Sequence, residues 1–300
     1  MTLPDGVRLG ISPLSWINEV IEAFGRDTTA HTCLSEAEAA GYAGVETSRK
    51  FPTDADKLQT LLGEYDLALA SGWHSGELAT RDVAAEMEAV ADHARLLSAM
   101  GCDVMVYGEV AMMAPGAPLD VGMSHRVKMP EDSIADYAAS LTEFAGRLHT
   151  TYGLRLAYHH HLMMIAETWP EIDAILGQSG PEVGLLLDTG HAHAGGFDYH
   201  RLIKAHGARI VHIHLKDVRD EVLQTVRTDD QSFNDGVRAG MFTVPGDGCV
   251  DFAPLVRFVR DSGYQGWLVV EAEQDPDTAA PGPAVTRAFN HISNLFGTTT

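Results

Sequence analysis

Histidine and carboxylate side chains occur in short clusters in the second half of the chain. Four clusters follow directly on apolar runs: His-His-His at 159–161, Asp-Thr-Gly-His at 188–191, His-Ile-His-Leu-Lys-Asp at 212–217 and Glu-Ala-Glu at 271–273. Imidazole and carboxylate groups bind divalent first-row metals and exchange protons near neutral pH. These residue types predict a metal-assisted or acid–base site at the ends of strands.

Period-two alternation sorts these side chains by the face of the strand on which they lie. His159 and His161 share a face and His160 points the other way. Within the later clusters, the residues that share a face are His212, His214 and Lys216 on one strand and Glu271 and Glu273 on the next.

One residue from each of four consecutive runs can therefore converge on a single point. Taken singly, each residue has a purely structural explanation. The three histidines at 159–161 could form a solvated loop, the H-x-H pair at 212–214 could be hydrogen-bonded in the core, Asp188 could cap a turn, and Glu271 could be a surface carboxylate. Jointly they predict a site for Mn²⁺, Co²⁺ or Zn²⁺. Its ligands would be His159, Asp188, His214 and Glu271.

Other side chains at predicted strand ends are candidates for the same site. We expect the substrate to be contacted by Trp16, Trp73, His74, Glu109 and His161. The two tryptophans could either stack on a substrate ring or fill the mouth of the barrel by packing. Methionines at 112, 113, 123 and 129 resemble copper ligands in type, but their irregular spacing favours apolar packing of a lid.

The elements that position these residues are predicted from hydrophobic periodicity. Eight apolar runs suit strands: 8–12, 43–47, 67–73, 103–108, 154–159, 183–188, 210–214 and 267–271. Eight stretches of helical spacing alternate with them: 32–40, 55–65, 82–100, 131–150, 170–177, 199–206, 252–262 and 283–296. Glycines at several predicted helix ends suit left-handed C-caps. The pattern predicts an α/β fold, the closed (β/α)₈ or TIM barrel.

A doubly wound open sheet is the alternative fold, but the first strand leads into ISPLSW and lacks a G-x-G-x-x-G turn. We expect residues 1–300 to form one barrel domain with long connections at about 109–130 and 216–250. Long loops that follow strands in a barrel are typical of lids and substrate loops, or are plain surface loops.

Composition excludes several classes of protein. The 300 residues include 21 Lys+Arg and 42 Asp+Glu, a formal charge of −21, which opposes binding to nucleic acid. We expect neither a membrane span nor a signal peptide, because the sequence has no polybasic run, no apolar run of membrane-spanning length and no basic segment followed by an apolar one near residue 1. The three cysteines, at 33, 102 and 249, form no C-x-x-C pair and suit thiols in a reducing cytoplasm. A homo-oligomer is compatible with this composition.

Six segments together resemble the inosose dehydratases of the xylose-isomerase-like TIM barrels, over residues 10–276. They are GISPLSW (10–16), AYHHH (157–161), LLLDTGHAHAGG (185–196), HIHLKDVR (212–219), FTVPGDGCVDF (242–252) and GWLVVEAEQDP (266–276). The resemblance implies dehydration of 2-keto-myo-inositol to a trihydroxycyclohexane-1,2-dione in myo-inositol catabolism, with Mn²⁺ or Co²⁺.

The superfamily that the sequence resembles places Glu, Asp, His and Glu around its metal. Asp188, His214 and Glu271 match the last three, whereas His159 stands where the first glutamate is usual. The first ligand is therefore His159 or His161, or the site has three protein ligands and more water. A dehydration of this kind needs a base for a carbon-bound proton and an acid for the leaving hydroxyl. Glu46, Glu109 or Glu273 would be the base, and Lys216 and His191 the donors; Glu273 is equally suited to support a metal ligand.

Three other functions fit parts of the pattern. A sugar isomerase or epimerase would use the same metal, a repair endonuclease would need a basic groove, and a metal-storage protein would need only the histidines. The expected partner is a small neutral polyol ketone, because no Arg or Lys cluster is present for a phosphate.

Overall fold

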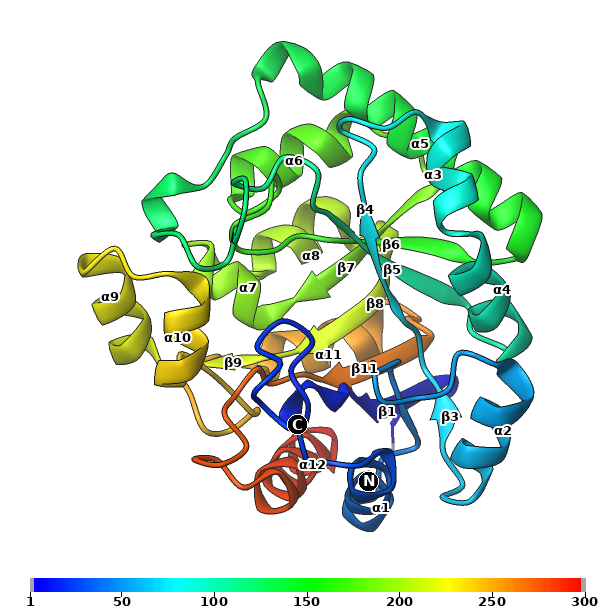
Figure 1. Cartoon of the computed structure of the whole chain (residues 1–300), viewed down its shortest axis with the longest axis vertical. Coiled ribbons are helices and arrows are strands. Elements are labelled where there is room, and N and C mark those ends of the chain that lie inside the picture. The colour runs from blue at the N-terminus through cyan, green and yellow to red at the C-terminus, as the bar shows by residue number, and fades with distance from the viewer. Residues whose placement is uncertain (1–2, 298–300) are drawn as a thin grey trace.

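A closed parallel barrel lies at the centre of the computed structural model, which describes residues 3–297 (Figure 1). Its sheet has nine strands among these residues, in the order β3-β2-β1-β11-β8-β7-β6-β5-β4, and every neighbouring pair is parallel. The strands are β1 (Val7–Ile11), β2 (Gly44–Val45), β3 (Ala68–Leu69), β4 (Trp73–Gly76), β5 (Val104–Glu109), β6 (Arg155–His159), β7 (Val183–Asp188), β8 (Ile210–Leu215) and β11 (Gly266–Val270).

The barrel closes because β3 and β4 are two parts of one extended segment. Ala70 N–H donates to the Val45 carbonyl on one side, and Val106 N–H donates to the Gly72 carbonyl on the other. Residues 68–76 thus bridge β2 and β5, so the nine strands occupy eight barrel positions. The predicted (β/α)₈ barrel is confirmed.

Helices surround the strands on the outside (Figure 1). They are α1 (Ala30–Ala40), α2 (Ala55–Gly63), α3 (Val83–Ala89), α4 (Ala91–Ala99), α5 (Ile134–Tyr152), α6 (Trp169–Gln178), α7 (Thr189–Ala194), α8 (His200–His206), α11 (Ala253–Asp261) and α12 (Pro281–Gly297). Asp54 and Asp82 cap two of them by accepting from backbone N–H groups, and Gly41 and Gly153 end α1 and α5 in the left-handed region, at φ 99° and 76°.

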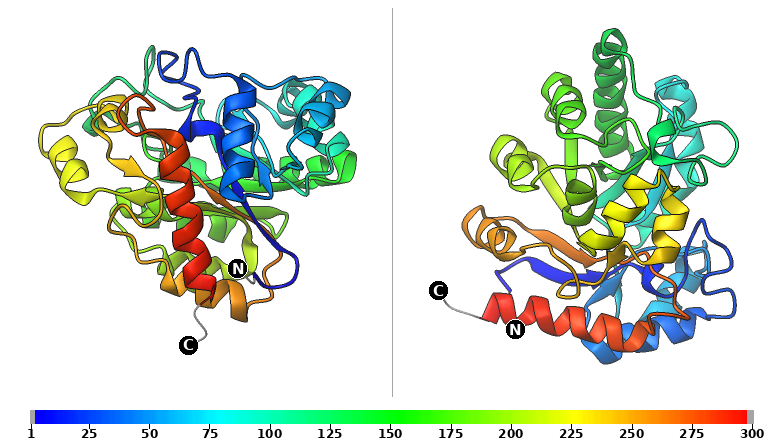
Figure 2. Two further views of the ribbon diagram at one scale, coloured as in Figure 1. Left: turned by 90° about the horizontal axis from the view of Figure 1, so that it is seen from below. Right: turned by 90° about the vertical axis from the view of Figure 1, so that its left-hand side faces the viewer.

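The predicted helix over 82–100 is two helices, α3 and α4, that meet at Val90. The hydrogen-bond ladder nevertheless continues, because Val90 N–H donates to the Glu86 carbonyl and Ala94 N–H donates to the Val90 carbonyl. Helix α12 runs alongside α1, as both views in Figure 2 show. Tyr42 joins the two regions by donating to the Val285 carbonyl at 2.8 Å.

Side chains inside and outside the barrel alternate along the strands, apart from a register shift between β7 and β8 near Leu185. One interior layer consists of Val104, Val106, Ala157, Leu186 and Val211. Their outward neighbours, such as Met105, Tyr107, Leu156 and Leu187, belong to the main core shared with the helices. This alternation decides which residues at the strand ends face the mouth of the barrel.

The predicted long connection at 216–250 contains elements of its own. They are β9 (Asp217–Val218), α9 (Asp220–Thr228), α10 (Phe233–Ala239) and β10 (Phe242–Thr243), with β9 and β10 paired antiparallel. Figure 1 shows α9 and α10 projecting from one side of the barrel. In the described part of the chain, no helix is both long and apolar enough to cross a membrane.

Candidate metal centre and active site

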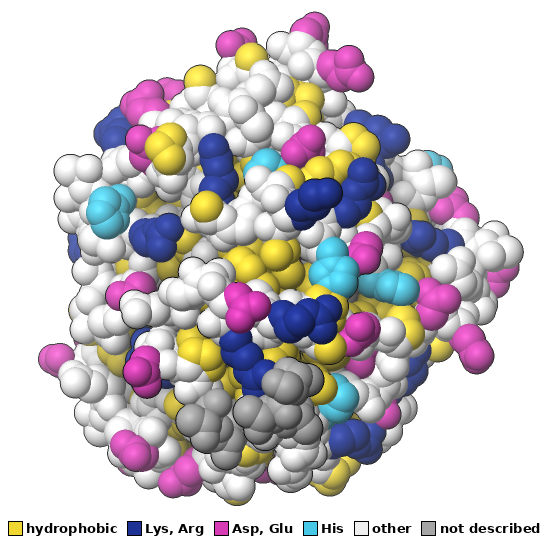
Figure 3. Space-filling model, turned by 180° about the vertical axis from the view of Figure 1, so that it is seen from behind, with side chains coloured by type: hydrophobic (Ala, Val, Ile, Leu, Met, Phe, Trp, Pro, Cys, Tyr) yellow, Lys and Arg dark blue, Asp and Glu magenta, His cyan; other side chains and the backbone are white. Residues whose placement is uncertain are grey.

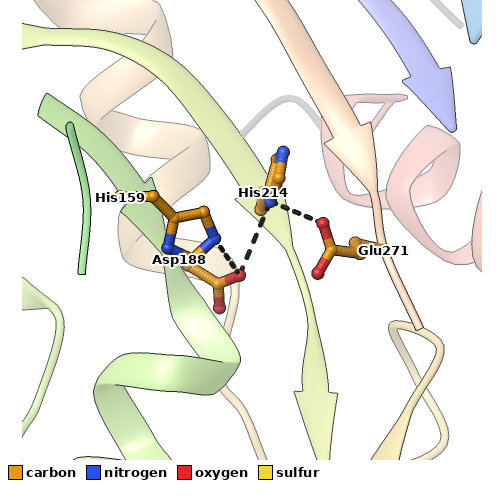
Figure 4. A group of neighbouring side chains, drawn as sticks. All are labelled: His159, Asp188, His214 and Glu271. Atoms are coloured by element: carbon orange, nitrogen blue, oxygen red, sulfur yellow. Dashed lines mark ion pairs between the residues drawn. The ribbon is translucent and has the colours of Figure 1, made fainter. Parts of the chain in front are cut away.

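Four buried side chains meet where neighbouring strands end (Figure 4). His159 and Asp188 are the last residues of β6 and β7, His214 lies one residue before the end of β8, and Glu271 follows β11. The parallel register pairs Asp188 with His214 and His214 with Val269, which brings the four positions together. The convergence predicted from strand alternation is therefore present in the fold.

The donor atoms of these residues surround one point. Asp188 Oδ2 lies 3.6 Å from His159 Nε2 and 3.7 Å from His214 Nδ1, and His214 Nδ1 lies 2.7 Å from Glu271 Oε2. All four donors lie within 4.8 Å of one another. Asp188 Oδ2 is buried and accepts no hydrogen bond, a costly state for a carboxylate oxygen unless a cation satisfies it. The two imidazoles and two carboxylates thus fit a divalent metal ion.

A second set of contacts orients the two histidines. His214 Nε2 lies 3.0 Å from Glu46 Oε1, which also lies 3.0 Å from His212 Nε2 and accepts a 2.6 Å hydrogen bond from Ser71 Oγ. His159 Nδ1 lies 2.6 Å from the His160 carbonyl. In each ring one nitrogen is thus held by an acceptor and the other faces the centre, as is usual for metal-binding histidines.

His160 points away from the centre, as alternation predicts. Its Nε2 accepts from Asp188 N–H at 3.2 Å, so it supports the backbone of the β7 end. The His161 ring is a neighbour of the His159 ring, with centroids 5.4 Å apart, but its donor atom groups with those of His191 and Glu273. Of the two histidines considered as first ligand, the structure places His159 with Asp188, His214 and Glu271.

Lys216 is buried beside the carboxylates. Its Nζ lies 2.5 Å from Glu271 Oε1, 3.6 Å from Glu273 Oε2 and 2.9 Å from His191 Nε2. Burial alone would lower the pKa of Lys216, but Glu271, Glu273 and Asp188 outweigh burial and raise it. The side chain therefore remains an ammonium group.

Burial and charge set the protonation states at the centre. Burial alone would lower the pKa of His214, yet Glu271 and Glu46 raise it well above its usual value. Burial opposes ionisation of Glu271, but His214 and Lys216 hold the pKa of this carboxyl well below its usual range. Burial raises the pKa of Glu273 to about 7, against the effect of Lys216. A histidine binds metal in its neutral form. A metal ion at the centre would therefore take the place of the His214 proton and supply the positive charge beside Glu271.

A cavity of about 630 Å³ opens over the centre. His159, His214, Glu271 and Glu273 contribute to its floor, and Arg49 is the one Lys or Arg among the described residues that line it. Its size is within the usual range for a small-molecule site. Side chains that analysis of the sequence did not single out also line it: Ser12, Asn18, Glu19, Ser75, Asp120 and Asn234.

Trp73 and His161 line the cavity among the residues expected to contact substrate. The Trp73 ring stands edge-on to His159, with ring centroids 5.6 Å apart. The expectation for Trp16 is corrected: its ring is 1% exposed and its Nε1 donates to Glu36 Oε2 on α1 at 2.6 Å. Trp16 belongs to the packing between barrel and helix and lies outside the cavity lining.

The expectations for His74 and Glu109 are also corrected, for a shared reason. On β4, Trp73 and Ser75 face the cavity, so His74 points outward, where its Nε2 lies 2.6 Å from Glu86 Oε1 on α3. On β5, Val106 faces the interior, and Glu109 points outward to accept from Tyr107 Oη at 2.9 Å. Alternation along these two strands was the signal that would have placed both residues outside.

The two long connections meet above the cavity. Ser124 donates to Asp230 through its N–H and its hydroxyl, at 2.8 and 2.7 Å, and Met123 N–H donates to the Gln231 carbonyl. Asn234 Nδ2 donates to Asp120 Oδ1 at 2.9 Å. Segment 110–125 and segment 229–238 are therefore joined into one cover, which we call the composite lid.

Comparisons with known proteins agree with this geometry. The family model described as the xylose isomerase-like TIM barrel matches residues 34–292. The chain belongs to this family.

Within the family, the chain is similar to inosose dehydratases and to a protein of rhizopine catabolism. It is 36% identical to inosose dehydratases of Clostridium perfringens strain ATCC 13124 (95% of this chain, 96% of that protein) and Geobacillus thermodenitrificans (97% and 98%). It is 42% identical to the rhizopine catabolism protein MocC of Rhizobium meliloti (92% and 84%). The resemblance predicted from the sequence motifs is confirmed.

Solved structures share the fold at low sequence identity. The zinc-bound IOLI protein is 17% identical, with a TM-score of 0.69 over 97% of this chain and 98% of that one. D-Allulose 3-epimerase from Methylomonas sp., in complex with D-allulose, is 20% identical, with a TM-score of 0.67 over 98% and 99%.

Proposed function

We propose that this protein is an inosose dehydratase, a hydro-lyase of myo-inositol catabolism. It would convert 2-keto-myo-inositol (scyllo-inosose) to a trihydroxycyclohexane-1,2-dione. The observation that carries the proposal is a buried His/Asp/Glu centre at the floor of a cavity sized for one sugar-like ring. Full-length identity of 34–36% to inosose dehydratases supports the choice of reaction.

The cofactor we assign is a divalent cation, Mn²⁺ or Co²⁺, with Zn²⁺ as the alternative. His159, Asp188, His214 and Glu271 would hold it, and the buried Asp188 Oδ2, which accepts no hydrogen bond, supports that assignment. When bound, such an ion supplies Lewis acidity that makes the C–H bond beside the substrate ketone more acidic. Two neutral nitrogens with two carboxylates suit these metals better than an all-oxygen Mg²⁺ or Ca²⁺ site does.

The proton movements fall to side chains on the same strand ends. Glu273 lines the cavity two residues beyond Glu271, so we assign its carboxylate as the base for the carbon-bound proton. The electron pair of the broken C–H bond forms the ring double bond, and the hydroxyl on the next carbon leaves as water. Lys216 and His191 lie near Glu273, and we assign them the delivery of a proton to that hydroxyl. The enol that remains is a tautomer of the dione.

The cavity lining suits a neutral polyol. Ser12, Ser75 and Asn234 offer hydrogen-bond partners for ring hydroxyls, and Trp73 offers an apolar wall for the ring. A phosphate would need a group of cations, whereas the lining offers a single guanidinium. We place the reaction in the cytoplasm, because all three cysteines are thiols, two of them buried.

The decisive experiment is turnover of 2-keto-myo-inositol by the purified protein. The dione product absorbs in the ultraviolet, so its appearance should be abolished by a chelator and restored by added Mn²⁺ or Co²⁺. Isomeric inososes without any dione would overturn the dehydratase proposal and favour an isomerase or epimerase on the same barrel. Unchanged dione formation after complete metal removal would overturn the assigned cofactor.

A further inference from the structure

A second group of metal-binding side chains lies outside the active-site cavity. His193 on α7, Asp220 at the start of α9 and Cys249 in the segment between β10 and α11 come from three separate parts of the chain. Their donor atoms lie within 4.8 Å of one another. They line a separate cavity of about 510 Å³.

The other two donor atoms, from Asp220 and Cys249, both lie near His193 Nε2. Asp220 Oδ1 lies 2.8 Å from it and Cys249 Sγ lies 3.6 Å from it. In a tetrahedral zinc site, bond lengths of about 2.3 Å to sulfur and 2.0 Å to nitrogen place S and N about 3.5 Å apart. The S···N distance already fits, and the shorter N···O contact would open as an ion replaces the hydrogen bond.

A catalytic cysteine is the competing explanation for this group, and the contacts oppose it. A Cys-His-Asp relay uses both ring nitrogens of histidine, one for the nucleophile and one for the carboxylate. Here Asp220 and Cys249 share the same nitrogen.

The surroundings favour a cation. Asp198 and Asp251 line the same cavity, and Arg227 is the one Lys or Arg among its described lining residues. A thiolate with an imidazole selects a softer metal such as Zn²⁺ over Mn²⁺. This chemistry differs from that of the active-site centre, whose four donors include no sulfur.

We propose that His193, Asp220 and Cys249 form a second, zinc-type metal site, independent of the active-site centre. The cavity leaves room for water as the remaining ligand. An ion bound there ties α7, α9 and the segment before α11 together at the base of the composite lid. The site is separate from the proposed dehydratase activity and is tested without any substrate.

Cobalt substitution gives a readout that reports this site alone. A thiolate bound to Co²⁺ produces a sulfur-to-metal charge-transfer band in the near ultraviolet, which His, Asp and Glu ligands do not give. Cys33 and Cys102 are 0% and 8% exposed and lie in the main core, so Cys249 is the cysteine able to produce it. The chelator-stripped full-length protein should develop the band on Co²⁺ titration under reducing conditions, and Zn²⁺ should abolish it.

Matched variants make the test specific. Cys249→Ser and His193→Ala should each lose the band, and Cys249→Ser should bind one Co²⁺ fewer per chain than the wild type. His200→Ala alters the same cavity outside the donor group and should retain the band. The proposal is overturned if the wild type shows no band at saturating Co²⁺, or if the band or the metal content is unchanged in Cys249→Ser.

Discussion

Asp188 serves two neighbours through its two carboxylate oxygens. Oδ1 caps α7 by accepting from His191 N–H at 2.7 Å, and Oδ2 faces the metal centre. His214 is divided in the same way, with Nδ1 toward the centre and Nε2 toward Glu46. At the scale of single residues, the centre is therefore held in place by bonds made on the far side of its ligands.

Glu46 provides a test of this support. Glu46→Gln keeps the volume but removes the charge that orients His214, so metal affinity should fall by about tenfold or more. Isothermal titration of the stripped protein measures the change. Glu109→Gln removes a buried carboxylate outside the cavity and serves as the control; equal affinities in the two variants would contradict the role of Glu46.

The assigned ligands predict a loss of metal-dependent activity. His214→Ala and Glu271→Ala each remove one of four donors, and turnover restored by Mn²⁺ or Co²⁺ should be abolished in both. Far-ultraviolet circular dichroism should remain that of the wild type, because the barrel core lies in other layers. Wild-type turnover in both variants would exclude this centre as the active one.

The role of Glu273 is separable from metal binding. Glu273→Gln should lower kcat by about 10²- to 10⁴-fold, the usual contribution of a general base, because an amide cannot take the proton. Metal content per chain, measured on the same preparation, should equal that of the wild type. An unchanged kcat would show that Glu273 is not the base, and loss of the metal would show that its role is not separable from metal binding.

Sequence patterns placed the centre because its ligands stand at strand ends and alternation gives their faces. The same rule, applied to β4 and β5, sends His74 and Glu109 outward. Ser12 lies at a strand end as well, and its position was open to the same reasoning. Asn234 was beyond such reasoning, since it reaches the cavity through a lid whose position depends on contacts far apart in sequence.

At the scale of elements, the helices α9 and α10 are the features that simple periodicity missed. The segment before α10 is polar, and both α9 and α10 are short. Their stability comes from packing: Leu223, Val226, Phe233 and Val237 form a separate apolar cluster with Leu162 and Met163 from the loop after β6. Strands and outer helices were predictable because their apolar spacing is long and regular.

Asp230 is the point at which the lid can be opened selectively. Asp230→Gly keeps the left-handed backbone, at φ 47°, accessible while removing both bonds to Ser124. We expect faster proteolytic cleavage within 110–125 and a raised KM, with metal content unchanged. Asp229→Gly removes the same charge one residue away and serves as the control. Identical cleavage rates of the two variants would contradict the role of Asp230 in joining the two halves of the lid.

At the scale of the whole molecule, the chain carries a formal charge of −21. On the face shown in Figure 3, Lys and Arg side chains are scattered among Asp and Glu and form no continuous basic surface. Phosphate backbones bind to clustered cations, so this face offers nucleic acid little attraction.

One buried carboxylate couples folding to pH. Burial raises the pKa of Glu109 to about 7, despite hydrogen bonds from Ala111, Tyr107 and Ala79. Between the usual carboxyl pKa of 4.5 and about 7, the folded state binds the proton more tightly, so the contribution of Glu109 to stability falls as pH rises. Over that window the loss amounts to about 3 kcal/mol.

Glu109→Gln should remove this pH dependence. Relative to wild type, the free energy of unfolding of the variant should rise between pH 5 and 7 by roughly 2 to 3 kcal/mol and level off above about pH 7. Denaturant titrations across that range measure it, with Glu38→Gln, an exposed position on α1, as the control. Parallel curves for Glu109→Gln and wild type would contradict the prediction.

The clasp between the two halves of the composite lid also limits how the enzyme can diverge. Segments 110–125 and 229–238 are distant in sequence, yet they share hydrogen bonds: Ser124 donates to Asp230, and Asn234 donates to Asp120. A change of substrate by mutation in one half leaves polar groups unpaired in the other. Homologues that accept different rings should therefore have exchanged both segments in concert, and a lid transplanted from such a homologue should work only when both halves are moved together.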